Sequence, residues 1–89
     1  MGLGRPWRRR FAREPAVAIG DPRFDGWETV AVLDDEATAV AWRDHLRDAG
    51  VDAACVSDHT LDRLGRGDVH LVVPPPQWSR ANEIVENLD

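Results

Sequence analysis

The sequence predicts one small α+β domain whose elements follow the order strand, helix, strand, strand, helix. Three observations lead to this prediction. A chain of 89 residues has the length of a single domain. Two segments, 34–50 and 75–88, carry apolar residues at helical spacing. Three others, 27–33, 51–57 and 68–73, are rich in valine and small apolar residues, as strands are.

The first expected strand is "WETVAVL", residues 27–33, which is apolar on both of its faces. Such a pattern is typical of a central strand covered on both sides. A helix follows, because Asp34 or Asp35 can accept a backbone N–H as its cap and Gly50 can adopt the left-handed conformation that ends it. Its buried stripe is expected to contain Ala39, Trp42, Leu46 and Ala49.

The second half of the chain is read in the same way. "VDAACVS", residues 51–57, is the second strand, and "DVHLVV", residues 68–73, is the third. Residues 58–67 connect them as a loop with two glycines. Prolines suit the first turn of the last helix, whose apolar stripe comprises Trp78, Ala81, Ile84, Val85 and Leu88.

The order of the elements predicts the topology. A right-handed crossover places the third strand between the first and the second, with both helices on one face of an antiparallel sheet. This is a ferredoxin-like arrangement without the fourth strand that normally follows the last helix. The outer edge of strand 27–33 is therefore expected to be open. Either the short segment 15–19 ("PAVAI") or a second chain is expected to fill it.

Charge divides the chain into a leader, residues 1–26, and a domain, residues 27–89. Residues 1–13 hold five arginines and no acid, whereas the remaining 76 residues have a net charge of −10. We expect this leader to contact an acidic protein surface, and we expect the acidic domain to repel nucleic acid. The arginines are Arg5, Arg8, Arg9, Arg10 and Arg13.

Composition also predicts a location. The chain contains one cysteine and no apolar run long enough to cross a membrane, which indicates a cytoplasmic protein without a transmembrane segment.

Two joins between elements carry a pattern of core and cap positions: Leu46, Gly50 and Val51 at the first, and Val73, Pro74, Ala81 and Ile84 at the second. This pattern resembles the bacterial signal-transducing protein domain, a family similar in fold to the PII regulators. The resemblance covers about residues 27–88. It implies a small regulatory or ligand-sensing module, and it supplies no catalytic residue. Many relatives add a zinc ribbon, but a single cysteine is too few for one, so we expect no metal and no cofactor.

The same resemblance directs attention to the loop between the second and third strands, which PII proteins use for signalling. His59, Arg63 and Arg66 are the candidate ligand contacts here, because guanidinium groups bind carboxylate and phosphate groups well. The alternative, which we prefer, is a solvated connection with Leu61 and Leu64 tucked beneath it.

The sheet face without helices is the candidate interface. A loop symmetric about residues 58–67 would place Cys55 opposite His70, and the exposed face would then present Ala53, Cys55, His70 and Val72. Such an apolar face predicts a protein partner or a homo-oligomer, unless Trp7, Phe11 or Trp27 covers it from within. A nucleophilic Cys55–His70 pair is disfavoured, because no third group orients it.

These observations favour a non-enzymatic regulatory or protein-interaction module. Two alternatives stay open. One is a sensor of a small anion or nucleotide that uses the loop at residues 58–67. The other is an accessory subunit whose basic leader inserts into a larger bacterial assembly.

Overall fold

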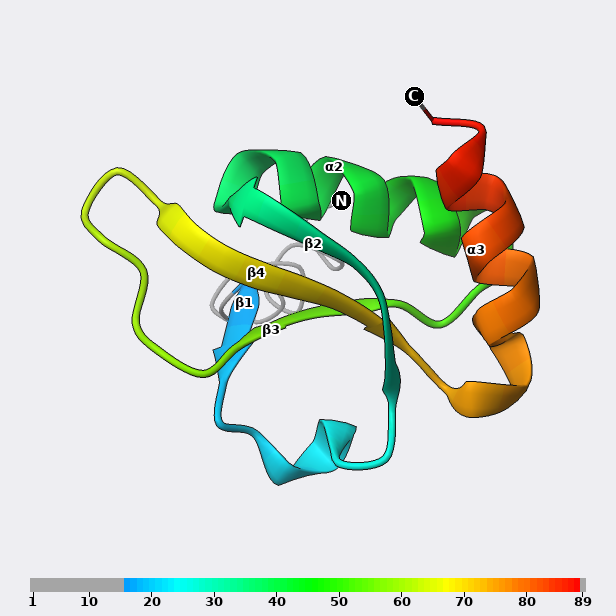
Figure 1. Cartoon of the computed structure of the whole chain (residues 1–89), viewed down its shortest axis with the longest axis horizontal. Helices are drawn as coiled ribbons and strands as arrows, with labels where there is room; N and C mark the ends of the chain where they lie inside the picture. Colours follow the sequence, from blue (N-terminus) through cyan, green and yellow to red (C-terminus); the bar gives the residue numbers. More distant parts are fainter. Residues whose placement is uncertain (1–15, 89) are drawn as a thin grey trace, which may run out of the picture.

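A computed structural model describes residues 16–88 and confirms an α+β class, with a four-stranded sheet and two helices (Figure 1). The strands lie in the order β1-β3-β4-β2. The elements are β1 (Val17–Ile19), the 3-10 turn η1 (Pro22–Phe24), β2 (Glu28–Asp35), α2 (Glu36–Asp48), β3 (Ala54–Ser57), β4 (Arg66–Val73), the 3-10 turn η2 (Pro75–Gln77) and α3 (Trp78–Glu86).

Helix α2 begins and ends where its sequence signals indicate. The Asp35 carboxylate accepts a hydrogen bond from the Thr38 backbone N–H at 3.4 Å, and Gly50, with φ of +89°, takes the chain out of the helix. Ala39 and Leu46 are completely buried against the sheet. Each helical turn therefore contributes to one apolar face, which is the face that the sequence spacing predicts.

Both helices pack on the same face of the sheet. Ala81 and Val85 of α3 belong to the same core cluster as Leu46 of α2 and Leu71 of β4. Helix α3 is also attached to the sheet edge, because the Trp78 indole N–H donates a hydrogen bond to the Thr29 carbonyl at 3.0 Å. The core thus lies between the sheet and a single helical layer.

Strand β4 pairs with β3 on one side and β2 on the other, both antiparallel, as the predicted crossover requires. The sheet is nevertheless mixed rather than antiparallel, because β1 runs parallel to β3. Residues 17–19 therefore extend the sheet at the edge opposite to the one where we expected "PAVAI". Docking there buries Val17 in the core, and the Arg43 side chain reaches the Ala16 carbonyl at 3.5 Å.

The register between β3 and β4 differs by one residue from the symmetric prediction. Cys55 lies opposite Leu71, and His70 lies opposite Val56. Because side chains alternate between the two faces of a strand, this shift moves Cys55 to the helix-covered face. The loop is correspondingly not symmetric about residues 58–67, because its turn closes with an Asp62 N–H to Arg66 carbonyl bond at 3.1 Å.

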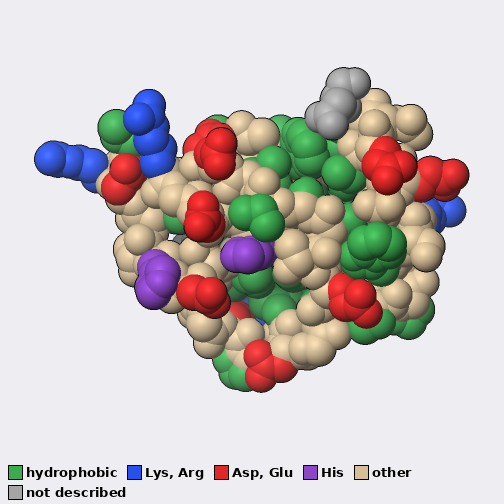
Figure 2. Space-filling view, in the orientation of Figure 1, with side chains coloured by type: hydrophobic (Ala, Val, Ile, Leu, Met, Phe, Trp, Pro, Cys, Tyr) green, Lys and Arg blue, Asp and Glu red, His purple; other side chains and the backbone are tan. Residues whose placement is uncertain are grey.

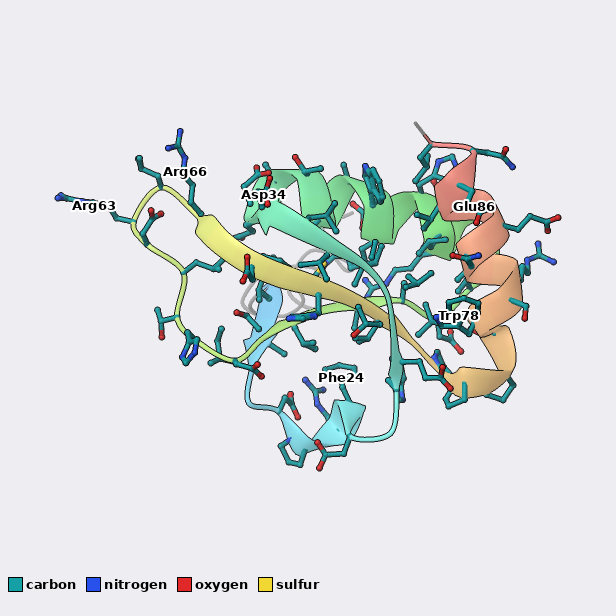
Figure 3. The ribbon with its side chains drawn as sticks, viewed as in Figure 1. Phe24, Asp34, Arg63, Arg66, Trp78 and Glu86 are labelled. Atoms are coloured by element: carbon teal, nitrogen blue, oxygen red, sulfur yellow. The ribbon has the colours of Figure 1, made fainter. Side chains whose placement is uncertain are left out.

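The opposite face of the sheet is partly covered from within the chain. The connection from β1 to β2 passes across it and carries Phe24 and Trp27, whose rings meet edge to face at 4.9 Å between centroids (Figures 1 and 3). Ala54 and Val72 are buried on this side although they are outside the helix-side core. Trp27 is one of the three aromatic residues expected to cover this face, whereas Trp7 and Phe11 lie outside the described residues.

Candidate functional site

The β3–β4 loop is held by its own polar groups. One Asp62 carboxylate oxygen accepts hydrogen bonds from the backbone N–H groups of Leu64 and Arg66, both at 2.8 Å. At the base of the loop, the Ser57 hydroxyl lies 2.9 Å from the carbonyl oxygens of both His59 and Asp68. These bonds give the loop a defined shape without any ligand.

The three predicted ligand contacts in this loop do not converge on one hollow. His59 lines a hollow of about 290 Å³ at the base of the loop, together with His70. Arg66 lines a different, open depression beside Asp34 and Asp35, and Arg63 lines neither of these two hollows. In Figure 3 both arginines project from the tip of the loop. The geometry supports the solvated connection better than a shared anion site. Leu61 packs against the core as expected, but Leu64 is 71% exposed rather than tucked beneath the loop.

The Cys55–His70 pairing is wrong, because the two side chains lie on opposite faces of the sheet. Cys55 is buried against α2, and this burial raises the pKa of its thiol to about 11. A thiol with this pKa is protonated at neutral pH, so it is a poor nucleophile. His70 is half-buried on the other face, where no described thiol accompanies it.

The predicted interface is also corrected by the register. Ala53 and Cys55 belong to the buried core on the helix side, and Val72 is covered on the other side. Of the four residues, only His70 keeps accessible surface. Its cross-strand neighbour Val32 is 53% exposed, so the accessible part of this face has moved toward β2.

Strand β2 forms the exposed edge of the sheet. It pairs with β4 alone, and no other described strand lies along its eight residues. The Trp78 indole covers the Thr29 carbonyl at one end. Register irregularities flank the centre of the strand, but Ala31, Val32 and Leu33 pair regularly with β4. An unpaired edge of this kind presents backbone N–H and C=O groups that another strand can bind.

The charge along this edge is acidic. Glu28 and Asp34 are exposed, Asp35 is half-buried, and β2 contains no basic residue. Neither the Glu28 nor the Asp34 side chain forms a hydrogen bond or ion pair with any residue from 16 to 88. Figure 2 shows this side of the molecule, with acidic side chains distributed around apolar and histidine surface. The edge is therefore apolar at its centre and carries an exposed acid near each end, with Arg66 of β4 beside Asp34 and Asp35.

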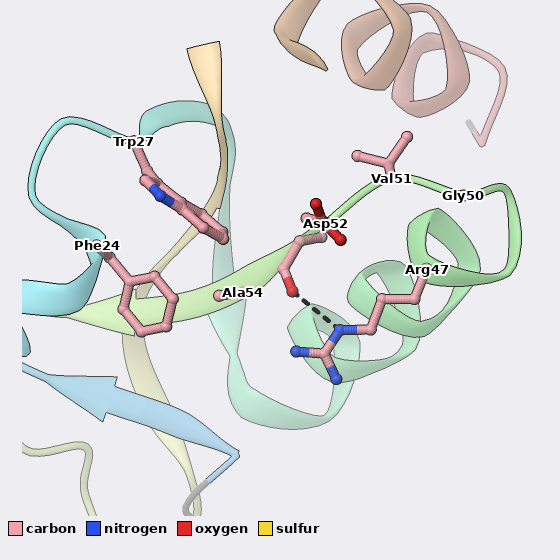
Figure 4. A pocket seen from close by; sticks show the side chains of 8 residues that line it. Phe24, Trp27, Arg47, Gly50, Val51, Asp52 and Ala54 are labelled. Carbon is pink, nitrogen blue, oxygen red and sulfur yellow. Dashed lines mark hydrogen bonds between the residues drawn. The ribbon is translucent and has the colours of Figure 1, made fainter. Parts of the chain in front are cut away.

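A second hollow, of about 430 Å³, was not predicted from the sequence. Phe24 and Trp27 form one wall and the α2–β3 connection forms the other (Figure 4). The Arg47 guanidinium crosses it and donates a hydrogen bond to the Ala53 carbonyl at 2.9 Å, while Asp52 adds the opposite charge. Charges of both signs, already engaged within the chain, give this hollow no preferred ligand.

Comparison of the chain with family models, curated proteins and solved structures finds no match. Among residues 16–88, no group of three or more histidine, cysteine or acidic side chains is placed to hold a metal ion. No helix in the same part of the chain is long and apolar enough to span a membrane. The geometry of the sheet edge is thus the observation on which a function can be argued.

Proposed function

We propose that this chain is a small, non-enzymatic regulatory module that binds an extended segment of another protein along the free edge of β2. The unpaired edge is the single observation that carries the proposal. In a ferredoxin-like arrangement it is the position of the fourth strand, and here β1 fills the opposite edge instead. A partner strand would therefore extend the sheet at a position that no strand of residues 16–88 occupies.

The edge offers two kinds of contact to such a strand. Unpaired backbone groups give hydrogen bonds worth about 0.5–1.5 kcal/mol each, and these bonds are independent of the partner's side chains. Val32, more than half exposed, adds apolar contact on the outer face. Selectivity then comes from Glu28 and Asp34, which favour neutral or basic partner segments over acidic ones.

Peptide selection with hydrogen exchange tests this proposal. A library of random peptides displayed on phage is selected on the full-length chain, and backbone exchange is measured with and without the selected peptides. We expect basic, extended peptides that slow the exchange of amides in residues 29–35. Val32→Arg should weaken their binding at least tenfold, because it removes apolar contact and adds a positive charge.

Ala41→Arg is the matched control, because Ala41 is an exposed residue of α2 and the substitution adds the same side chain away from the edge. This variant should bind the peptides like the unmodified chain. The proposal fails if no peptide is selected. It also fails if the selected peptides protect residues 58–67 or the Phe24–Trp27 hollow and leave β2 unchanged.

A further inference from the structure

We infer that the strand that binds at the β2 edge is the arginine-rich segment 5–13 of a second copy of this chain. The inference rests on the proposed function and names the partner of that same edge. It follows from the charge of the edge, the composition of the segment and the position at which the segment joins the sheet.

The charge of β2 argues against the simplest dimer, in which two β2 edges pair with each other. If two copies of β2 overlapped along their whole length in an antiparallel two-fold pairing, Glu28 of one copy would lie near Asp34 or Asp35 of the other. Like charges facing each other across paired strands are destabilising. The charge of the edge therefore disfavours pairing with a second β2 strand and favours pairing with a basic strand. The Glu28 and Asp34 carboxylates have no hydrogen-bond or ion-pair partner among the described residues.

The chain itself contains such a basic segment. Residues 5–13 read "RPWRRRFAR", with five arginines and no acid. In an extended conformation Trp7 and Phe11 fall on one face, because residues four apart in a strand share a face. That face, which also carries Arg5, Arg9 and Arg13, offers aromatic contact to the exposed Val32, while Arg8 and Arg10 fall on the other face. Pro6 lacks an N–H, which is tolerated at the edge of a sheet.

The point of attachment favours a second copy over the same copy. The leader joins the sheet at β1, and Arg43 of α2 holds the Ala16 carbonyl at that edge. Strand β2 is the opposite edge, about 14 Å away across three strand spacings (Figure 1). Within one copy the segment would have to pass around a covered face. Between copies, donor and acceptor at opposite edges give head-to-tail association.

Sedimentation of the full-length chain over a range of concentrations tests the inference. We expect association at low salt that weakens at least tenfold between about 50 and 500 mM salt, because exposed charges are screened. Replacing the five arginines of residues 5–13 with glutamine should abolish it. Glu28→Gln combined with Asp34→Asn should do the same.

The matched control combines Asp48→Asn with Glu83→Gln. These exposed acids lie on the two helices, so the control changes net charge equally without touching the edge. It should associate like the unmodified chain. If the control dissociates as fully as the edge variant, net charge rather than the edge governs association, and the inference fails.

A charge exchange gives the strictest test. One variant carries glutamate at the five leader arginines, and a second carries Glu28→Arg and Asp34→Arg. Each should be monomeric alone because leader and edge repel, and a mixture of the two should associate because each leader then meets an edge of opposite charge. A mixture that stays monomeric overturns the inference.

Two other outcomes also overturn it. The first is an unmodified chain that stays monomeric at several hundred micromolar and low salt. The second is a monomer in which the protection of β2 amides depends on the leader arginines, which would place the leader on the edge of its own copy. Selected peptides that still protect residues 29–35 would leave the proposed function standing in both cases, whereas peptides that bind elsewhere would remove both conclusions.

Discussion

At position 55 the sheet places a thiol between β1, β4 and α2, where water does not solvate the thiolate. Burial is the largest cause of its raised pKa, and the nearby Arg43 and Arg47 offset it only in part. The composition of the chain separates the titration of this thiol from that of other side chains. The sequence has no tyrosine, and all 11 of its basic residues are arginines. Cysteine is therefore the one side-chain type in this sequence whose ordinary pKa lies near this range, since tyrosine and lysine are absent.

We predict that the chain loses stability as the pH rises from 9 to 11. The unfolded thiol, with a pKa near 9.0, releases its proton before the folded thiol, with a pKa of about 11. The unfolded state then binds fewer protons, so the free energy of unfolding falls, by about 2 kcal/mol at pH 11. Urea unfolding at each pH measures this. Cys55→Ala should show little of the decrease, and an equal decrease in that variant would exclude Cys55 as its source.

The elements divide into those that local sequence determines and those that it does not. Asp35 and Gly50 mark the ends of α2, and the spacing of Leu46 and Ala39 identifies its buried face, so these features were predictable. The register of β3 and β4 was not, because the apolar pattern does not reveal that the loop closes through Asp62 rather than symmetrically. The docking of β1 was not predictable either, since it depends on contacts with residues far away in the sequence.

The candidate site shows the same division. The count of strands in the sequence predicted an open edge beside strand 27–33, and no strand within residues 16–88 pairs with that edge. The interface residues Ala53 and Cys55 were misplaced, because a period-two pattern converts a one-residue error into the wrong face. The exposure of Val32 was not predicted. Strand β2 is apolar on both faces, so its pattern does not indicate which valine is exposed.

Two valines on the same sheet face predict opposite responses to the same substitution. Val72→Arg should lower the free energy of unfolding by roughly 3 kcal/mol or more, because the side chain is 4% exposed beneath the β1–β2 connection. Val32→Arg should change it by less than about 0.5 kcal/mol, because the side chain is 53% exposed. Thermal or urea unfolding measures both. Similar losses in the two variants would contradict the assignment of the covered and open ends of this face.

On the scale of the whole molecule, the folded unit begins before the boundary that composition suggests. The proline, glycine and arginine content of residues 1–26 predicted a leader separate from the domain. In the structure, however, Val17 packs in the core and Phe24 covers the outer face of the sheet. Val17 lies beside Cys55 of β3, and Phe24 lines a hollow together with Ala54 of the same strand. Strand β3 follows α2 in the sequence, so neither contact is local. The part of the leader that packs on the sheet therefore extends from at least residue 17.

Truncation tests this boundary. A chain that starts at Ala16 should keep its thermal midpoint within about 2 °C of the full chain at concentrations where both are monomeric. A chain that starts at Trp27 should melt at least 10 °C lower, because it loses Val17, at roughly 1.5–3 kcal/mol, together with the cover over Ala54 and Val72. Equal thermal midpoints for the two truncated chains would show that residues 16–26 add no stability, and the folded domain would then begin at residue 27.

The central position of β4 has a consequence for how the chain folds. Val17 and Cys55, which pair in the sheet, are 38 residues apart in the sequence, and Glu28 and Val73 are 45 apart. Only the β3–β4 hairpin joins neighbours along the chain, so its closure costs the least entropy. We expect this hairpin to form the nucleus, with α2 condensing on it and the edge strands β2 and β1 joining afterwards. In this order β2, the strand with the exposed acidic edge, pairs with β4 late. Until it does, β4 has no partner on that side.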